Sequence, residues 1–121
     1  MVMAAADFQL LANAGFLPAS FKPGETIFAE GEKGDKMYVI RTGEVEVERN
    51  GKIVETLSAG GIFGEMALID GSPRAATARA KTACEVAPIT EKSFLFLVHE
   101  TPYFAIAVMR TLAERLRRSR P

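Results

Sequence analysis

The pattern of hydrophobic and polar positions divides this chain of 121 residues into three parts. Over residues 4–14 apolar side chains recur at helical spacing, and the pattern stops at Gly15, which predicts an N-terminal helix within a helical segment over residues 1–16. Over residues 20–90 short apolar runs alternate with glycine-rich turns, which is typical of an antiparallel β-sandwich or barrel. Over residues 91–118 the helical spacing returns.

The clearest strand pattern in the central part is the sequence EVEVE. Its strict alternation predicts a strand in which Val45 and Val47 face the core and the glutamates face solvent. The next two residues after the strand region, Asn50 and Gly51, predict a hairpin turn into a return strand over residues 53–57. Further strands are expected over residues 37–41, 76–80 and 83–89.

Two helices are predicted in the last third of the chain. Thr90 can cap a helix that ends near His99, and Thr101 followed by Pro102 is a typical helix start. The second helix is apolar over residues 103–109 and then carries several arginines. The ordinary interpretation of these arginines is a solvated helix end that complements the helix dipole.

Composition and charge exclude several functions. Fifteen basic residues balance fifteen acidic ones, so the net charge gives no general attraction to nucleic acid or to a membrane surface. Cys84 is the only cysteine, which excludes an internal disulfide and a multi-cysteine metal cluster. The N-terminus lacks the features of a signal peptide, and no stretch is apolar for long enough to span a membrane. We therefore expect one soluble, cytoplasmic domain over residues 1–121.

No arrangement of residues in the sequence points to catalysis. His99 is the only histidine, and a metal-dependent cupin enzyme, the other β-barrel class considered, would need several. Cys84 is expected in a strand, as a small buried side chain. Ser72 and Thr77 have neither a G-x-S-x-G context nor a histidine partner. We expect that the protein is not an enzyme and uses neither a metal nor a catalytic cofactor.

The segment GEMALIDGSPRAAT, residues 64–77, holds one acid and one base among small residues. A helix that begins at Gly64 or Glu65 would present unpaired N–H groups to an anion, for which phosphate is the natural candidate. Arg74 follows the turn and could bind two phosphate oxygens with its planar fork. Glu65 would repel a phosphate, so a sugar hydroxyl suits it better.

The charges of this segment narrow the ligand further. One arginine and one helix end match a single negative charge, and the chain has no P-loop sequence for a triphosphate. A singly charged phosphodiester with a free 2′-hydroxyl describes a 3′,5′-cyclic nucleotide. From spacing alone, the alternative is a surface ion pair between Glu65 and Arg74 around an ordinary loop.

The same segment resembles a known family. FGEMALIDGSPRAATARA is similar to the phosphate-binding cassette of cyclic nucleotide-binding domains, here residues 63–77. FKPGETIFAEGEKGDKMYVIRTGEVEV resembles the first strands of that family in kinase regulatory subunits and catabolite-activator-like regulators, and RAKTACEVAPI resembles the bacterial branch. The resemblance covers residues 21–116 and implies an α+β fold. That fold is an antiparallel β-roll, like a double-stranded β-helix or jelly roll, with an N-terminal helix and two C-terminal helices.

The resemblance also implies roles for individual residues. Glu65 would bind the ribose 2′-hydroxyl and Arg74 the exocyclic phosphate oxygens. The N–H groups of Ala67 and Ala75 would complete the phosphate site, with Gly64 beside the sugar. The remaining candidates are Met66 and Ala76 in the cassette and Val47, Val54 and Leu57 at the base, for which ordinary barrel core is the alternative.

The function implied by the resemblance is signalling. The domain would bind cyclic AMP, with cyclic GMP as the alternative ligand, and regulate a separate, unidentified protein by movement of the C-terminal helix. The chain ends at Pro121, without the helix-turn-helix of bacterial regulators, so direct DNA binding is not expected. Two alternatives remain: a binding domain excised from a larger channel or transcription regulator, and a degenerate domain that serves only protein contact. The intact Glu65 and Arg74 disfavour the degenerate domain.

Overall fold

The computed structural model describes residues 17–118, so the helix predicted over residues 4–14 lies outside the described part. Within it, the chain forms eight strands and three helices. The strands are β1 (Ala19–Phe21), β2 (Thr26–Phe28), β3 (Lys36–Thr42), β4 (Val45–Arg49), β5 (Lys52–Leu57), β6 (Ile62–Phe63), β7 (Thr77–Ala80) and β8 (Cys84–Thr90). The helices are α2 (Glu65–Asp70), α3 (Glu91–Glu100) and α4 (Tyr103–Arg118).

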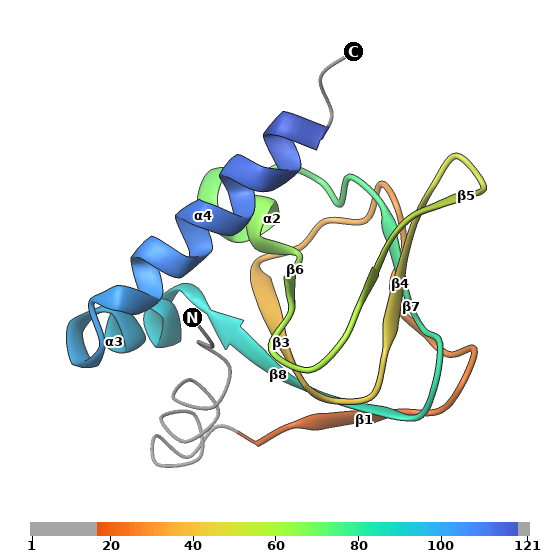
Figure 1. Ribbon diagram of the computed structural model, residues 1–121, viewed down its shortest axis with the longest axis horizontal. Coiled ribbons are helices and arrows are strands. Elements are labelled where there is room, and N and C mark those ends of the chain that lie inside the picture. Colours follow the sequence, from red (N-terminus) through yellow and green to blue (C-terminus); the bar gives the residue numbers. More distant parts are fainter. Residues whose placement is uncertain (1–16, 119–121) are drawn as a thin grey trace.

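The strands make two four-stranded sheets, in the orders β1-β8-β3-β6 and β2-β7-β4-β5. All of their pairings are antiparallel. Figure 1 shows the two sheets facing each other as a roll, with α3 and α4 at one end and α2 next to α4. The predicted antiparallel β-roll is therefore confirmed for the described residues.

The EVEVE strand and its hairpin form as predicted. Val45 is fully buried, and β4 pairs with β5 through a turn in which Asn50 and Gly51 have φ angles of 54° and 78°. Positive φ at both central residues is what a two-residue hairpin turn requires, and asparagine and glycine tolerate it best. The pairing between β4 and β5 then changes register between Val47 and Glu48.

This register shift decides which side chains of β5 face the inside of the roll. Val47 pairs with Glu55, whereas Glu48 pairs with Ile53, so Val54 is an extra residue without a directly opposed partner. Paired residues of two antiparallel strands lie on the same face of the sheet. Glu55 therefore lies on the same face as Val47, and the side chain of Val54 is half exposed.

The two C-terminal helices also agree with the sequence. The hydroxyl of Thr90 caps α3 by accepting from the N–H of Ser93 at 3.2 Å. The predicted helix start at Thr101 and Pro102 is correct to within one residue, since α4 begins at Tyr103 and the N–H of Phe104 donates to the carbonyl of Thr101 at 2.8 Å.

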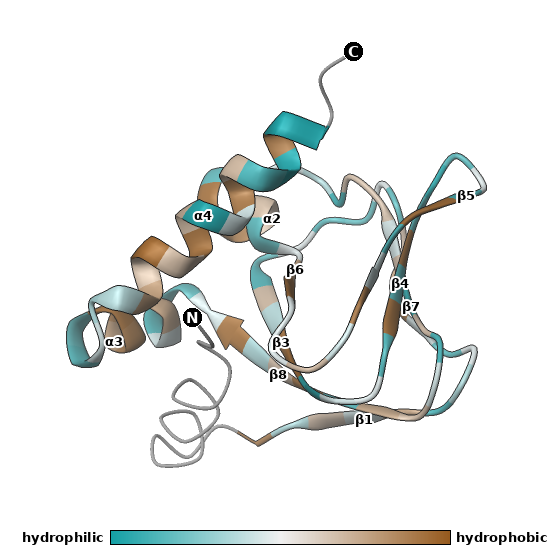
Figure 2. Ribbon diagram, in the orientation of Figure 1, coloured by the Kyte–Doolittle hydropathy of each residue, from teal (hydrophilic) through white to brown (hydrophobic). Residues whose placement is uncertain are grey.

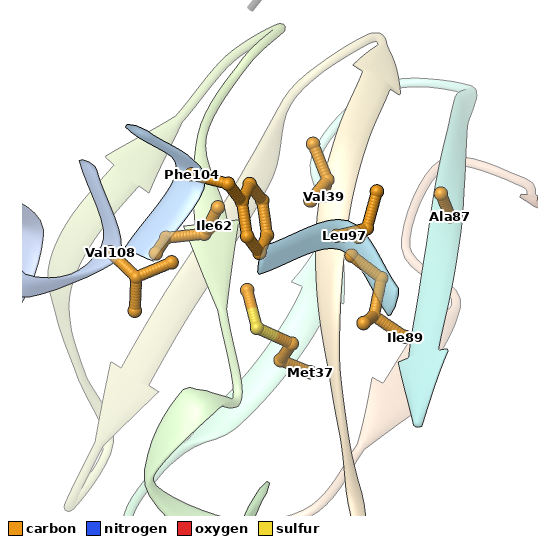
Figure 3. Close-up of a cluster of buried hydrophobic side chains, with 8 residues drawn as sticks. All are labelled: Met37, Val39, Ile62, Ala87, Ile89, Leu97, Phe104 and Val108. Atoms are coloured by element: carbon orange, nitrogen blue, oxygen red, sulfur yellow. The ribbon is translucent and has the colours of Figure 1, made fainter. Parts of the chain in front are cut away.

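The helices pack on the roll through one apolar cluster, shown in Figure 3. Its buried members are Met37, Val39, Ile62, Ala87, Ile89, Leu97, Phe104 and Val108. Phe104 and Val108, the two residues of α4 in this cluster, both lie in its N-terminal half. Figure 2 shows that the ribbon of α4 becomes hydrophilic toward its C-terminal end. Apolar burial therefore anchors the beginning of α4 more firmly than its end.

None of the helices within residues 17–118 is long and apolar enough to cross a membrane.

Phe104 should be the main apolar anchor of α4. The residue is 1% exposed, and the centroid of its ring lies 5.5 Å from that of Phe94 in an edge-to-face arrangement. Phe104→Ala should lower the free energy of unfolding by about 3 to 5 kcal/mol, because it removes a buried ring and leaves a cavity. Urea denaturation of both proteins measures this change.

The matched control is Met109→Ala, on the same helix at a side chain that is 54% exposed. Its effect should stay within about 0.5 kcal/mol. Equal effects of the two substitutions would show that α4 is not held by this cluster.

Candidate functional site

The segment predicted to hold a ligand lies between β6 and β7. Gly64 follows β6 with φ 77°, and α2 begins at Glu65 and ends at Asp70. The next residue, Gly71, caps the helix, and its N–H donates to the carbonyl of Ala67 at 3.0 Å. The predicted short helix and the turn after it are therefore confirmed. The first N–H groups of α2 have no partners within the helix, so they are available to a ligand.

Arg74 lies under this segment with its guanidinium buried. Nη1 donates to the carbonyl of Gly64 and Nη2 to that of Lys36, both at 2.9 Å, and Cζ lies 4.0 Å from the ring centroid of Phe28. A Cβ atom on Gly64 would lie 2.7 Å from Nη1, and one on Gly34 would overlap the guanidinium. Glycine at these two positions allows the fork to lie where it does.

Arg74 is a buried cation without an anionic partner in the described structure. Only 6% of Arg74 is exposed, and none of the ion pairs within residues 17–118 includes it. Burial lowers the pKa of Arg74 from its usual value, yet a guanidinium stays protonated in proteins. A buried charge is costly unless it is paired. The site therefore favours an anion next to this arginine.

Glu65 is just as buried as Arg74 but has a cationic partner of its own. Only 4% of the residue is exposed, and its Oε1 accepts from Nη1 of Arg115 on α4. The same guanidinium donates through Nε to Glu55 at 3.1 Å and through Nη2 to the carbonyl of Ile62 at 2.5 Å. Arg115 thus connects α4 to β5, β6 and α2 at once.

Glu55 and Arg115 were not among the site residues predicted from the sequence. The inward position of Glu55 depends on the bulge at Val54, and a one-residue change of register reverses the faces of a strand. Arg115 belongs to the basic end of α4, which was interpreted as solvated. The sequence signal that could have identified Arg115 is its position three residues after Leu112, because residues at this spacing share a helix face. Leu112 also lines the cavity.

These residues surround a cavity of about 560 Å³. Pockets for small organic ligands measure about 300 to 1,000 Å³, so the volume is suitable for a nucleotide. The predicted site residues that line it are Val47, Val54, Gly64, Glu65, Met66, Ala67, Arg74, Ala75 and Ala76. Leu57 is the exception, because it packs against the apolar core between the sheets instead. The further lining residues are Phe28, Arg49, Glu55, Phe63, Pro73, Leu112, Arg115, Leu116 and Arg118.

Arg74 and Glu65 both line the cavity but do not form an ion pair with each other. Arg74 binds backbone carbonyls, and Glu65 binds Arg115 instead of Arg74. The surface ion pair between Glu65 and Arg74, the alternative interpretation of their spacing, does not form in the described structure. Arg74 can therefore bind an anion, while Glu65 can accept hydrogen bonds.

The other reactive residues lie away from the cavity. Cys84 is buried in β8, and burial raises the pKa of its thiol. His99 lies exposed in the last turn of α3, beside Glu100 at 3.9 Å. Within residues 17–118, no group of histidine, cysteine and acidic side chains could hold a metal ion.

Comparison with known families assigns the chain. The family model described as cyclic nucleotide-binding domain matches residues 18–101. The match covers more than half of the sequence, and the chain belongs to this family. The predicted resemblance to cyclic nucleotide-binding domains is thereby confirmed.

Three solved structures illustrate the similarity. The Thermus thermophilus catabolite activator protein is 30% identical, with a TM-score of 0.82 over 97% of this chain and 57% of that one. A cyclic nucleotide-binding domain from Methylobacillus flagellatus is 29% identical, with a TM-score of 0.72 over 83% of this chain and 61% of that one. The cAMP-bound form of the EAL enzyme Bd1971 is 33% identical, with a TM-score of 0.62 over 85% of this chain and 29% of that one.

The cGMP-bound form of Bd1971 matches as well, at 34% identity and a TM-score of 0.66, over 84% of this chain and 28% of that one. This chain thus spans little more than half of the Thermus activator and less than a third of the Bd1971 chain in its cGMP-bound form.

Proposed function

We propose that this domain binds cyclic AMP as a signal, with the phosphate on Arg74 and the ribose on Glu65. The observation that supports this most strongly is the buried guanidinium of Arg74, which faces the cavity without a carboxylate partner within residues 17–118. Two of its N–H groups donate to carbonyls, and further donors of the fork remain for phosphate oxygens. The N–H groups of Ala67 and Ala75 complete the phosphate site.

The ribose is assigned to Glu65 because this carboxylate has one oxygen to spare. Arg115 donates to Oε1, and a carboxylate accepts through both of its oxygens. A 2′-hydroxyl can therefore donate to Oε2 without displacing Arg115. Gly64, with no side chain, leaves room for the sugar beside Glu65, and Met66 and Ala76 line the same part of the cavity.

The base is assigned to the side of the cavity formed by Val47, Val54 and Leu112. Leu112 belongs to α4, so the C-terminal half of this helix forms one wall of the site. Leu57 is not part of this proposal, because it lies in the core.

Regulation would pass through the end of α4 to a separate protein. Val108 is the last buried residue of the helix, whereas Leu112, Arg115 and Arg118 reach the cavity. A ligand in the cavity would contact and order this end. Because the chain spans only 57% of the Thermus activator, the same helix motion would serve equally well within a larger regulator.

Arg74→Ala should weaken cyclic AMP binding by about 2 to 5 kcal/mol, the usual effect of removing one partner of a desolvated charge pair. This corresponds to roughly 30-fold to several thousandfold in affinity. Arg74→Lys, which keeps the charge but loses the fork, should fall in between. Titration calorimetry measures all three proteins.

The control for Arg74 is Arg79→Ala, at an arginine that pairs with Glu48 at 3.0 Å and does not line the cavity. Its affinity should match the wild type. If Arg74→Ala retains its circular dichroism spectrum and loses less than threefold in affinity, Arg74 does not bind the phosphate.

Ala75 should make the site prefer cyclic AMP over cyclic GMP. It lines the cavity directly after Arg74, and its methyl group cannot accept a hydrogen bond from the guanine 2-amino group. An unpaired buried donor costs about 1 to 3 kcal/mol, or roughly five- to two-hundredfold in affinity.

Ala75→Thr should reduce or reverse this preference by improving the affinity for cyclic GMP. Competition between the two nucleotides on wild type and variant measures it. A wild-type protein that prefers cyclic GMP would refute the assignment of the ligand.

Cyclic AMP should slow hydrogen exchange in residues 111–118 and leave residues 103–108 nearly unchanged. The reason is that Phe104 and Val108 already hold the first half of α4 in the core, whereas the second half faces the ligand. Exchange by mass spectrometry with and without cyclic AMP tests this, and protection confined to residues 64–77 would contradict a role for α4.

A further inference from the structure

We infer that Glu55 is a positioning residue of the site: it holds Arg115 on Glu65 and so makes the end of α4 part of the binding cavity. This inference rests on the proposed function for its meaning, but the contacts that support it exist without a ligand. Glu55 lies on β5, ten residues before Glu65 in the chain. None of the ion pairs among the described residues joins Glu55 to α2.

The first step concerns where Glu55 lies. Its pairing with Val47 places it on the inner face of the sheet, at the wall of the cavity, with 18% of its side chain exposed. An inward-facing carboxylate is costly unless cations compensate for its charge. Both of its oxygens are compensated from α4: Oε1 accepts from Arg115 and Oε2 from Arg118, each at 3.1 Å.

The second step concerns what holds the end of α4. No residue over 109–118 is buried. Leu112 is half-buried and packs against the apolar cluster that contains Phe104 and Val108. The ion pairs of Arg115 and Arg118 therefore attach the last turns of α4 to the roll. Two of these three pairs end on Glu55 and the third on Glu65.

The third step concerns how Glu55 acts on Glu65. Nε of Arg115 is bound to Glu55 and Nη2 to the carbonyl of Ile62, so the guanidinium presents only Nη1 to Glu65 and leaves Oε2 to the ribose hydroxyl. Without Glu55, the guanidinium could turn and bind both oxygens of Glu65, the geometry that arginine and carboxylates favour. That turn would cover the oxygen assigned to the sugar.

The test uses Glu55→Gln, which keeps the size of the side chain and removes its charge. The matched control is Glu48→Gln on the neighbouring strand β4, because Glu48 also pairs with an arginine, Arg79 at 3.0 Å, but does not line the cavity. Arg118→Gln removes one of the two pairs of Glu55 and should show a smaller effect. Thermal unfolding confirms that each variant is folded.

The first measurement is hydrogen exchange without ligand. In Glu55→Gln, amides over residues 111–118 should exchange several-fold faster than in the wild type, while residues 103–108 serve as the internal reference. Glu48→Gln should leave both segments unchanged. High salt should reduce the difference, because it screens partly exposed ion pairs. Equal exchange in Glu55→Gln and Glu48→Gln would overturn the inference.

The second measurement is the affinity ratio between cyclic AMP and its 2′-deoxy analogue. In Glu55→Gln this ratio should fall at least threefold, because the hydroxyl loses access to Glu65 while the deoxy analogue has nothing to lose. A ratio equal to that of the wild type would overturn the inference, since a purely structural role would weaken both ligands alike. If the wild type binds neither nucleotide, the proposed function fails, and the exchange measurement alone decides whether Glu55 positions Arg115.

Discussion

The burial of one positive charge without a matching negative charge is the constraint on which the site depends. A guanidinium removed from water requires hydrogen bonds and an anion. Within the described residues, Arg74 has the hydrogen bonds but no carboxylate in direct ion-pair contact. Two backbone carbonyls orient its fork, and the ring of Phe28 lies against its face. Glycine at positions 34 and 64 leaves room for it. The roll thus keeps a cation ready beside an open cavity.

This arrangement works only because Glu65 does not pair with Arg74. Arg115 provides the positive charge for Glu65, and Glu55 holds Arg115 in place. Under the proposed function, Arg74 and Glu65 are thereby kept for two different parts of the ligand. Since Arg115 belongs to α4, the electrostatic balance of the site is linked to the position of that helix.

Local patterns in the sequence predicted most of the fold. Strict alternation in EVEVE and the Asn50-Gly51 pair determine a hairpin through backbone preferences alone. Thr90 caps the helix α3 with its own side chain. The positions of Glu65 at the start of a helix and of Arg74 in the same cavity were also predicted, from a short segment and its family resemblance. For the hairpin and the cap, the decisive interactions lie within a few residues of one another.

The residues that were not predicted depend on distant contacts. The bulge at Val54 brings Glu55 to the cavity and leaves Leu57 opposite Val45 in the core, and nothing in the local pattern of β5 shows where the register changes. Arg115 is one of several arginines at the end of α4, and only packing of the helix against the roll distinguishes it from its exposed neighbours. The predicted helix over residues 4–14 lies outside the described residues.

A crystal structure of the protein with cyclic AMP would test the central claim most directly. The claim predicts the nucleotide in the cavity between β5, α2 and α4, with its phosphate oxygens within about 2.7 to 3.2 Å of the guanidinium of Arg74. It also predicts that the ribose 2′-hydroxyl donates to Glu65. A nucleotide bound elsewhere, or bound here with its phosphate away from Arg74, would contradict it.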